Sequence, residues 1–369
     1  MTIKTAYSTN PDPNRAAQEL LDGVGRLDLR FVAFFASAAY APDELGQALA
    51  QAFGQVPSIG CTTAGELVSG KMLKQSVVLV AFDAASLSAA HVSLAKDMKS
   101  EASVSAALDA LGRAVGKPPS DLDPDHYVGM VLHDGLSVAE ESVMSQLSAR
   151  TNVPFVGGSA GDDVQFKRTQ VFANFQPHAG ASALALLEPV GRFTILKTQS
   201  FEVLDKVLEV TDVDEATRTV RSFNGKPAAE EYAAQLGISP AELSEHFGSH
   251  PVGLVVAGGE PYVRSPQRID GTDVVFYCQV KAGMKLHILQ SRDIVEQTRQ
   301  DLDAKLQDFG PCGGIVNFHC ILRTLELEAK GQCDAYGAVF ERVPMVGFST
   351  YGESYIGHIN QTSTMLLLS

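Results

Sequence analysis

Three glycine-rich loops that each end in a carboxylate carry the residues best suited to chemistry in this sequence. They are Cys-Thr-Thr-Ala-Gly-Glu at 61–66, Gly-Ser-Ala-Gly-Asp-Asp at 158–163 and Phe-Ser-Thr-Tyr-Gly-Glu at 348–353. Hydroxyl groups, backbone N–H groups and a carboxylate in one loop can hydrogen-bond a small polar ligand from several directions. The composition of the loops therefore indicates a site for an amino-acid-like or other carboxylate ligand.

A purely structural role is the alternative for each loop, because glycine supplies turns with positive φ and Glu66 or Glu353 can cap neighbouring backbone groups. Since the pattern occurs three times, we expect at least one loop to line a site. Arg323 can bind a ligand carboxylate bidentately, or it can form a structural salt bridge with Glu353 or Glu66. The predicted ligand-binding residues are Cys61, Thr62, Thr63, Glu66, Ser159, Asp162, Phe318, Cys320, Arg323, Ser349, Thr350, Glu353 and Asn360.

Three histidines are candidate metal ligands because of their positions. His133 and His319 each follow an apolar run and occupy equivalent places in the repeats described below, and His358 follows the third loop. In open α/β sheets, ligands bind at the carboxyl ends of strands. An ordinary hydrogen-bonded histidine is the alternative for each position.

An enzyme is a further interpretation, with Cys61 or Cys320 as nucleophile or Glu66 and Glu353 as acid–base groups. Neither cysteine lies in a recognisable Cys/His signature, and no set of nucleophile, base and orienting group stands out. The sequence also lacks the P-loop and dinucleotide-binding fingerprints. We therefore expect a non-catalytic protein in which both cysteines are buried as small apolar side chains.

The elements that must position the loops repeat along the chain with them. A Val-Pro-x-[Ile/Val]-Gly phrase precedes each loop, at 56–60, 153–157 and 343–347. Before each phrase stand an apolar run and a helix-like segment, and after each loop comes a strand-like run. The second helix is expected to start with a capping box at 137–140. The repeats predict three superimposable units with Gly60, Gly157 and Gly347 at matching places.

Further strand-like runs at 193–210, 253–257 and 274–280 alternate with helix candidates at 227–236, 241–247 and 291–309. Alternation of this kind predicts an α/β fold with mixed sheets and flanking helices, built from repeated strand–helix–strand–Gly-loop–strand units. A turn cluster at 222–227 is the preferred boundary between domains. We expect an N-terminal lead-in at 1–29, a first domain at 30–222 and a second at 223–369.

Composition excludes several classes of protein. With 29 basic against 43 acidic residues the formal net charge is −14, and no Lys/Arg block stands out, so nucleic acid is not an expected partner. No signal peptide and no run of about 20 apolar residues is found, so we expect a cytoplasmic protein without a membrane partner. The five cysteines are scattered, unlike a disulfide framework or a Cys-x-x-Cys zinc site.

Taken together, these motifs resemble the FIST family. The resemblance rests on residues 59–66, 156–163 and 347–353, on Phe318-x-Cys320-x-x-Arg323, on Asn360-x-Thr362 and on residues 224–228. It extends from about Arg30 to the C-terminus. It identifies residues 30–222 as a FIST N-terminal domain and residues 223–369 as a FIST C-terminal domain.

The resemblance implies a small-ligand sensor, and it leaves two ligands open. Some family members are haem-based nitric-oxide sensors that regulate a partner histidine kinase or cyclic-di-GMP enzyme; others are thought to sense amino acids or similar metabolites. Because no output segment is visible in the chain, we expect a signalling partner. For haem we rank His319 first, since Arg323 can pair with a propionate, then His358 and His133, with Phe318, Phe348 and Tyr351 as aromatic cover.

Overall fold

The computed structural model describes residues 3–25, 28–255 and 259–369, and the chain divides into two compact units. The larger unit contains Met1–Thr198, Thr298–His358 and Ser363–Ser369, and the smaller unit contains Gln199–Gln297 and Ile359–Thr362. The predicted α/β class with mixed sheets and flanking helices is confirmed. The domain limits expected from the sequence follow the order of the chain, whereas these two units are interleaved along it.

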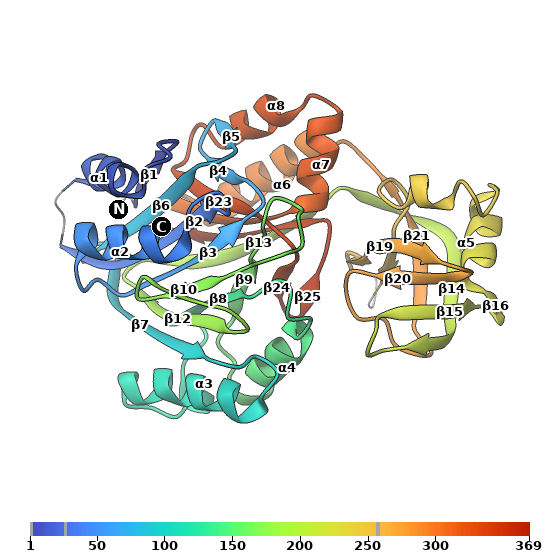
Figure 1. Ribbon diagram of the computed structural model, residues 1–369, viewed down its shortest axis with the longest axis horizontal. Helices are drawn as coiled ribbons and strands as arrows, with labels where there is room; N and C mark the ends of the chain where they lie inside the picture. Colours follow the sequence, from blue (N-terminus) through green and yellow to red (C-terminus); the bar gives the residue numbers. More distant parts are fainter. Residues whose placement is uncertain (1–2, 26–27, 256–258) are drawn as a thin grey trace. The chain divides into compact units, whose positions relative to one another are not determined.

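The first repeat forms a six-stranded sheet in the order β1-β6-β2-β3-β10-β11 (Figure 1). Its central strands β2 and β3 are parallel, and β6 and β10 flank them in the antiparallel direction. Helices α1 and α2 pack on one face. The bounds are β1 (Lys4–Ser8), α1 (Pro13–Val24), β2 (Leu29–Ser37), α2 (Pro42–Phe53), β3 (Ser58–Thr63), β6 (Val77–Asp83), β10 (Val171–Ala173) and β11 (Gln176–His178).

The second repeat forms a sheet in the order β25-β24-β9-β8-β12-β7, in which β8 and β9 are the parallel pair. Helices α3 and α4 pack on this sheet. The bounds are β7 (Leu87–Ala95), α3 (Glu101–Val115), the 3-10 turn η1 (Pro119–Asp121), β8 (Val128–His133), α4 (Glu140–Arg150), β9 (Phe155–Ser159), β12 (Ser182–Pro189), β24 (Glu353–Tyr355) and β25 (His358–Ile359).

The third repeat forms a sheet in the order β13-β26-β22-β23-β4-β5, with β22 and β23 parallel. Its helices α6, α7 and α8 lie together at the top of the larger unit in Figure 1. The bounds are β4 (Glu66–Val68), β5 (Lys71–Leu73), β13 (Phe193–Gln199), α6 (Ile294–Phe309), β22 (Gly314–Cys320), α7 (Ile321–Ala329), α8 (Cys333–Ala338), β23 (Met345–Thr350) and β26 (Thr362–Leu368).

The predicted equivalence of the three glycines is confirmed by strand register. Gly60 pairs with Phe34, Gly157 with Val131 and Gly347 with Asn317, in each case on the neighbouring parallel strand. A Cβ atom added to any of the three would overlap that paired residue. Glycine is therefore needed at these places for close approach of two strands.

Each glycine-rich loop leads its following strand into the sheet of a different repeat. Strand β4, after the first loop, pairs with β23 of the third repeat. Strand β10 pairs with β3 of the first repeat, and β24 pairs with β9 of the second. The three donations form a closed cycle, so every sheet contains a strand from another repeat.

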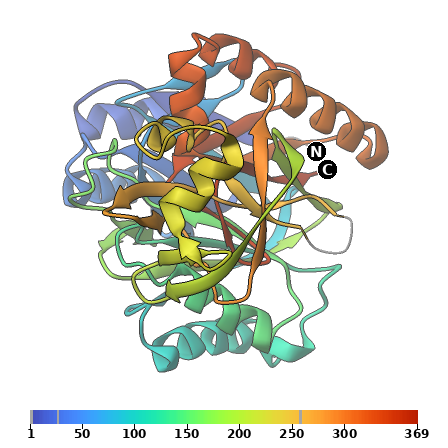
Figure 2. The same ribbon diagram turned by 90° about the vertical axis from the view of Figure 1, so that its right-hand side faces the viewer.

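The three sheets share one core, because alternate side chains of each strand face inward. Phe31, Ala33 and Phe35 of β2 face this core, whereas Val32 and Phe34 face α1 and α2. Strands β8 and β22 contribute their own inward side chains to the shared core, and the ring centroids of Phe35 and Phe348 lie 4.5 Å apart. In Figure 2 the helix groups of the larger unit, coloured blue, teal and orange to red, lie at its periphery.

The smaller unit is built on an antiparallel sheet in the order β18-β17-β21-β14-β15-β20-β19, with β16 beside β15. Helix α5 buries Tyr232 against Phe223, with ring centroids 6.2 Å apart. The bounds are β14 (Phe201–Asp214), β15 (Thr219–Phe223), β16 (Lys226–Pro227), α5 (Ala228–Leu236), the 3-10 turn η2 (Leu243–His246), β17 (Val252–Leu254), β18 (Tyr262–Arg264), β19 (Pro266–Asp270), β20 (Asp273–Phe276) and β21 (Lys285–Ser291).

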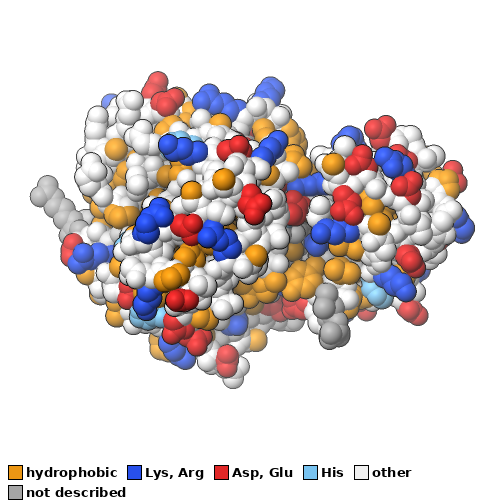
Figure 3. Space-filling model, turned by 90° about the horizontal axis from the view of Figure 1, so that it is seen from below, with side chains coloured by type: hydrophobic (Ala, Val, Ile, Leu, Met, Phe, Trp, Pro, Cys, Tyr) orange, Lys and Arg blue, Asp and Glu red, His pale blue; other side chains and the backbone are white. Residues whose placement is uncertain are grey.

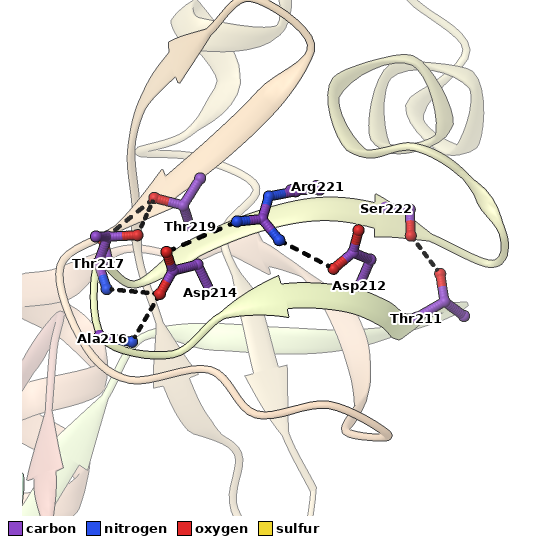
Figure 4. A network of polar contacts seen from close by, with 8 residues as sticks. All are labelled: Thr211, Asp212, Asp214, Ala216, Thr217, Thr219, Arg221 and Ser222. Carbon is purple, nitrogen blue, oxygen red and sulfur yellow. Dashed lines mark hydrogen bonds and ion pairs between the residues drawn. The ribbon is translucent and has the colours of Figure 1, made fainter.

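A polar network lies on the β14–β15 hairpin of this unit (Figure 4). Arg221 forms ion pairs with Asp212 at 3.3 Å and Asp214 at 3.7 Å, and Thr211 and Ser222 share a hydrogen bond of 2.7 Å. These side chains are exposed, so each ion pair contributes at most about 1 kcal/mol. The network stabilises the hairpin without enclosing a site.

Several element predictions need correction. The capping box at Ser137 is wrong: α4 begins at Glu140, and its N-cap Ala139 has no side-chain hydrogen bond, because Val138 adopts a φ of 54° in a turn. The helix predicted at 241–247 is only the 3-10 turn η2. The run at 274–280 forms a strand only as far as Phe276, and of the run at 253–257 the part at 256–257 lies outside the described residues.

Candidate functional site

The three glycine-rich loops meet at the carboxyl ends of the parallel strands and bond to one another in a ring. The backbone N–H of Ser349 donates to Gly65 O at 2.7 Å, and Ala64 N donates to Ser349 O at 3.2 Å. Equivalent pairs join the third loop to the second and the second to the first. They are Ser159 N to Gly352 O at 2.9 Å, Tyr351 N to Ser159 O at 3.1 Å and Gly161 N to Thr62 O at 2.9 Å.

The carboxylates of the first and third loops are bound within their own repeats. Thr63 Oγ1 donates to Glu66, and Ser76 donates to the other carboxylate oxygen from its backbone N at 3.1 Å and its Oγ at 2.6 Å. In the third loop Thr350 Oγ1 donates to Glu353 at 2.6 Å. Burial outweighs the hydrogen bonds at Glu66 and raises its pKa to about 7.

In the second loop, Asp162 holds a strained segment in place. Its carboxylate accepts hydrogen bonds from the backbone N–H groups of residues 166, 167 and 168, at 2.9, 2.6 and 2.9 Å, and from the Tyr351 hydroxyl. Burial acts to raise the pKa of Asp162, but these bonds together lower it below the ordinary value. The ring of Phe166, whose φ is 52°, stacks on Tyr351 at 4.9 Å.

Two of the predicted ligand-binding residues, Thr62 and Asp162, line a hollow of about 150 Å³. Its other lining residues are Ala38, Pro42, Gln165, Lys167, Arg168 and Gln170. A second hollow of about 440 Å³ lies between β7 and α3 and contains no predicted site residue. Elsewhere on the larger unit, Figure 3 shows basic and acidic side chains interspersed over one face.

Arg323, on α7, is the most unusual of the predicted residues. Its side chain is 1% exposed. Nη2 donates to Thr298 Oγ1 at 2.8 Å, but Nε and Nη1 have no hydrogen-bond partner. Among the described residues no carboxylate lies within ion-pair distance of it, so the alternative salt bridge to Glu353 or Glu66 is not formed. A positive charge is thus buried without an anion.

A buried polar chain begins at the end of β22, the strand that leads into α7. His319 Nδ1 bonds to the Tyr336 hydroxyl at 2.9 Å, that hydroxyl donates to Ser363 Oγ at 3.4 Å, and Ser363 donates to Asn317 Oδ1 at 2.6 Å. In this direction of donation Nδ1 carries the hydrogen, which leaves the lone pair of Nε2 without a partner. Burial, and then the charge of Arg323, hold the pKa of His319 well below its usual range.

His133 occupies the equivalent position in the second repeat. Its Nδ1 bonds to Ser182 Oγ at 2.8 Å, and its Nε2 has no partner. Burial, and then the charge of His358, lower its pKa to about 3. The ring of His358 lies against Gly352, where a Cβ atom would overlap it. In the part of the chain that the structure describes, no group of three or more His, Cys, Asp or Glu side chains is placed to hold a metal ion.

The remaining predicted residues are all buried, and most are engaged with their neighbours. Phe318 packs in the shared core, on the opposite face of β22 from His319, and so cannot cover a group bound there. Cys61 is buried, and burial followed by the charge of Glu66 raises its thiol pKa well above the ordinary value, which disfavours a nucleophilic thiolate. Cys320 is 1% exposed. Asn360 belongs to the smaller unit, and its side-chain amide has no hydrogen-bond partner.

Sequence reasoning missed the residues that complete these contacts. Thr324 Oγ1 lies 2.7 Å from Ser349 Oγ, and Ser159 Oγ donates to Glu140 at 3.3 Å. Tyr351 belongs to the third loop motif, but the sequence does not reveal that its hydroxyl donates a hydrogen bond to Asp162 of the second loop. Nothing in the local sequence around Thr298 or Tyr336 marks these residues, and Glu140 is expected only as part of a helix cap, because their partners are distant in the chain.

Comparison with known proteins supports the resemblance found in the sequence. The FIST N domain matches residues 30–226, and the FIST C domain matches residues 228–355. The chain is 25% identical over 320 residues to the uncharacterized protein MJ1623 of Methanocaldococcus jannaschii, covering 79% of this chain and 60% of the relative. The chain thus spans less than two thirds of that relative's length.

A crystal structure of cyanuric acid hydrolase from A. caulinodans is similar at 10% identity, covering 51% of this chain and 70% of that chain, with a TM-score of 0.30. No helix among the described residues is long and apolar enough to cross a membrane. Because the two domain matches together span most of the sequence, the chain belongs to the FIST family of sensory-domain proteins.

Proposed function

We propose that this FIST protein senses an amino acid or another small carboxylate, which it binds through Arg323, and that it signals through a partner protein. The observation that carries the proposal is the guanidinium of Arg323, which is 1% exposed, and whose Nε and Nη1 have no hydrogen-bond partner and no carboxylate within ion-pair distance in the described part of the chain. The proposed role is ligand binding without catalysis.

The energetics favour an anionic ligand at this place. Leaving one charge of a buried ion pair uncompensated costs about 3–5 kcal/mol. His319 does not supply the missing negative charge, because an imidazole is either neutral or positive, and its lowered pKa favours the neutral form. A bound carboxylate can accept hydrogen bonds from the guanidinium N–H groups that lack partners, and charge-assisted bonds of this kind are the strong ones.

The test is to compare wild type with Arg323→Ala in thermal-shift and calorimetric titrations against the free amino acids and against acetate, succinate and citrate. A compound at 100 times its Kd should stabilise wild type by about 2.7 kcal/mol. Arg323→Ala should lose this response while its own stability stays the same or rises, because an uncompensated charge is removed. Arg221→Ala, on the exposed hairpin, is the matched control and should respond like wild type.

Two results would contradict this proposal. One is a variant that still binds the active compound with wild-type affinity. The other is a large loss of stability in Arg323→Ala without any ligand response in wild type, which would make the arginine structural.

Haem is a second candidate ligand because of one observation, the partnerless Nε2 of His319. Its Nδ1–H is held by Tyr336, as the second nitrogen of a metal-ligating histidine usually is. The aromatic cover does not fit, because Phe318 and Phe348 face the shared core. Titration of the protein with haem decides between the two ligands. A Soret shift that is lost in His319→Ala would support haem, and a titration without a Soret shift would leave the carboxylate as the proposed ligand.

The proposed partner is a histidine kinase or a cyclic-di-GMP enzyme, as the family resemblance implies.

A further inference from the structure

One position has the same place in all three repeats but is covered differently in each. It is the hydroxyl residue near the end of the second parallel strand: Thr62 on β3, Ser159 on β9 and Ser349 on β23. The strand register makes them equivalent, since they pair with Ala36, His133 and His319 of the preceding parallel strands. The three can therefore be compared as three versions of one site.

In two repeats a side chain of a helix that precedes this strand covers the hydroxyl. In the second repeat it is Glu140, the first residue of α4, whose carboxylate accepts from Ser159 Oγ at 3.3 Å and is 3% exposed. In the third repeat it is Thr324 of α7, whose hydroxyl lies 2.7 Å from Ser349 Oγ. Polar side chains from within the protein thus fill both places.

In the first repeat the backbone of Gln170, rather than a helix side chain, bonds to this hydroxyl. Helix α2 begins with Pro42, which has no polar side chain, whereas α4 begins with Glu140. Pro42 and Thr62 both line the hollow of about 150 Å³. The hydroxyl of Thr62 accepts from the backbone N of Gln170 at 3.1 Å and donates to its carbonyl O at 3.5 Å, and Gln170 also lines the hollow. The hollow thus lies beside Thr62 at the start of α2, as the Glu140 carboxylate lies beside Ser159 at the start of α4.

The charges around the hollow suit an anion. Its charged lining residues are Asp162, Lys167 and Arg168. The oxygens of Asp162 already accept hydrogen bonds from three backbone N–H groups and from Tyr351. Arg168 Nη2 donates to Gln170 at 3.3 Å, and among the described residues no carboxylate lies within ion-pair distance of the side chains of Lys167 and Arg168. Two cationic residues without an ion-pair partner in the described part of the chain thus line a space of about 150 Å³.

We infer that this hollow is a second ligand site, which takes the carboxylate of a small molecule in the place that Glu140 has in the second repeat. Lys167 and Arg168 supply the opposite charge, and Thr62 forms part of the floor. The site is independent of Arg323, and its occupant need not be the ligand proposed there.

The experiment uses an internal competitor. Pro42→Glu copies the first residue of α4 into α2 and should place a carboxylate in the hollow; the helix should tolerate it, because an acid is favourable in the first turn. Gln47→Glu, at an exposed position of the same helix, is the control of equal charge. All variants are made in an Arg323→Ala background, so that the Arg323 site cannot contribute.

The probe is 13C-acetate, titrated at constant ionic strength with chloride as the balancing anion. The parent and Gln47→Glu should bind acetate, with amide shifts at Lys167 and Arg168, and Pro42→Glu should bind at least about tenfold more weakly, which corresponds to about 1.4 kcal/mol. Equal binding by Pro42→Glu and the parent would overturn the inference, as would no binding by the parent.

If Pro42→Glu does not fold, judged by circular dichroism, the double variant Lys167→Ala/Arg168→Ala decides instead. A loss of at least about tenfold in acetate affinity supports the site, and unchanged affinity refutes it. Neither outcome bears on the Arg323 proposal, which fails or holds by the titrations of wild type.

Discussion

Glu66 should make the stability of the protein depend on pH in a direction unusual for a carboxylate. Its side chain is 1% exposed, and burial raises its pKa from 4.5 to about 7 although Thr63 and Ser76 donate hydrogen bonds to it. In the unfolded chain Glu66 ionises at its ordinary pKa. Between pH 4.5 and pH 7 the folded state therefore binds more protons than the unfolded state, and stability falls as pH rises.

The expected size follows from the two pKa values. With 4.5 for the unfolded and about 7 for the folded state, linkage gives a cost of about 1 kcal/mol at pH 5 and about 3 kcal/mol at pH 8. The free energy of unfolding should thus lose about 2.5 kcal/mol over this range through Glu66 alone. His133 and His319 act in the opposite sense, because their depressed pKa values make stability fall as pH drops below their ordinary range.

The assay is urea unfolding of wild type and Glu66→Gln at pH 5, 6, 7 and 8. Glutamine cannot ionise, so the variant removes the pH-dependent term, and any lost hydrogen bond shifts all its values equally. The difference in unfolding free energy between the two proteins should change by about 2.5 kcal/mol in favour of the variant from pH 5 to pH 8. Glu44→Gln, on the exposed side of α2, should show no such change. A constant difference between wild type and Glu66→Gln would refute the reasoning.

Two further predictions concern the loops. Tyr351→Phe removes the hydroxyl that donates to Asp162, so it should raise the pKa of Asp162 and cost about 1.5–3 kcal/mol of stability in denaturant unfolding. It should also speed hydrogen exchange at residues 166–168, whose backbone N–H groups bond to Asp162, whereas the control Tyr7→Phe should have none of these effects. Gly347→Ala places a Cβ against the backbone of Asn317 and should lower the free energy of unfolding by about 1–3 kcal/mol or more. Gly248→Ala, whose Cβ would meet nothing within 4 Å, should be nearly neutral in the same measurement, and equal effects of the two variants would contradict the role of Gly347 in close strand approach.

The repeated unit of the fold could be predicted because its signal is local. Gly60, Gly157 and Gly347 stand in a phrase of adjacent residues, and their common register required only that similar phrases fold alike. The exchange of β4, β10 and β24 among sheets could not be predicted, because strands of three residues carry too little pattern to choose a partner. The turn cluster at 222–227 does contain a turn, at Asn224 and Gly225, but it joins β15 to β16 within the smaller unit.

The sequence predicts the residue types of the candidate site better than it predicts the contacts that these residues make. Arg323 was identified by its position near the Phe318 motif, yet its lack of an anionic partner depends on where distant carboxylates lie. Glu66 and Glu353 looked like ligand-binding groups and bond instead to threonines of their own loops. To predict the hollow at Thr62, one must know that α2 begins with Pro42 and α4 with Glu140. The wrong prediction of a capping box at Ser137 placed the start of α4 too early.

The cyclic exchange of strands also has a consequence for how the chain is made. During synthesis the first sheet lacks β10 until residue 173 has emerged, and β9 of the second sheet lacks its neighbour β24 until residue 355. Strand β22 likewise waits for β26, which ends at Leu368. A nascent chain therefore carries open strand edges, of the kind that pair wrongly with other chains, until Leu368 has been made. A chain cut short before β26 leaves these edges unpaired and is prone to aggregate.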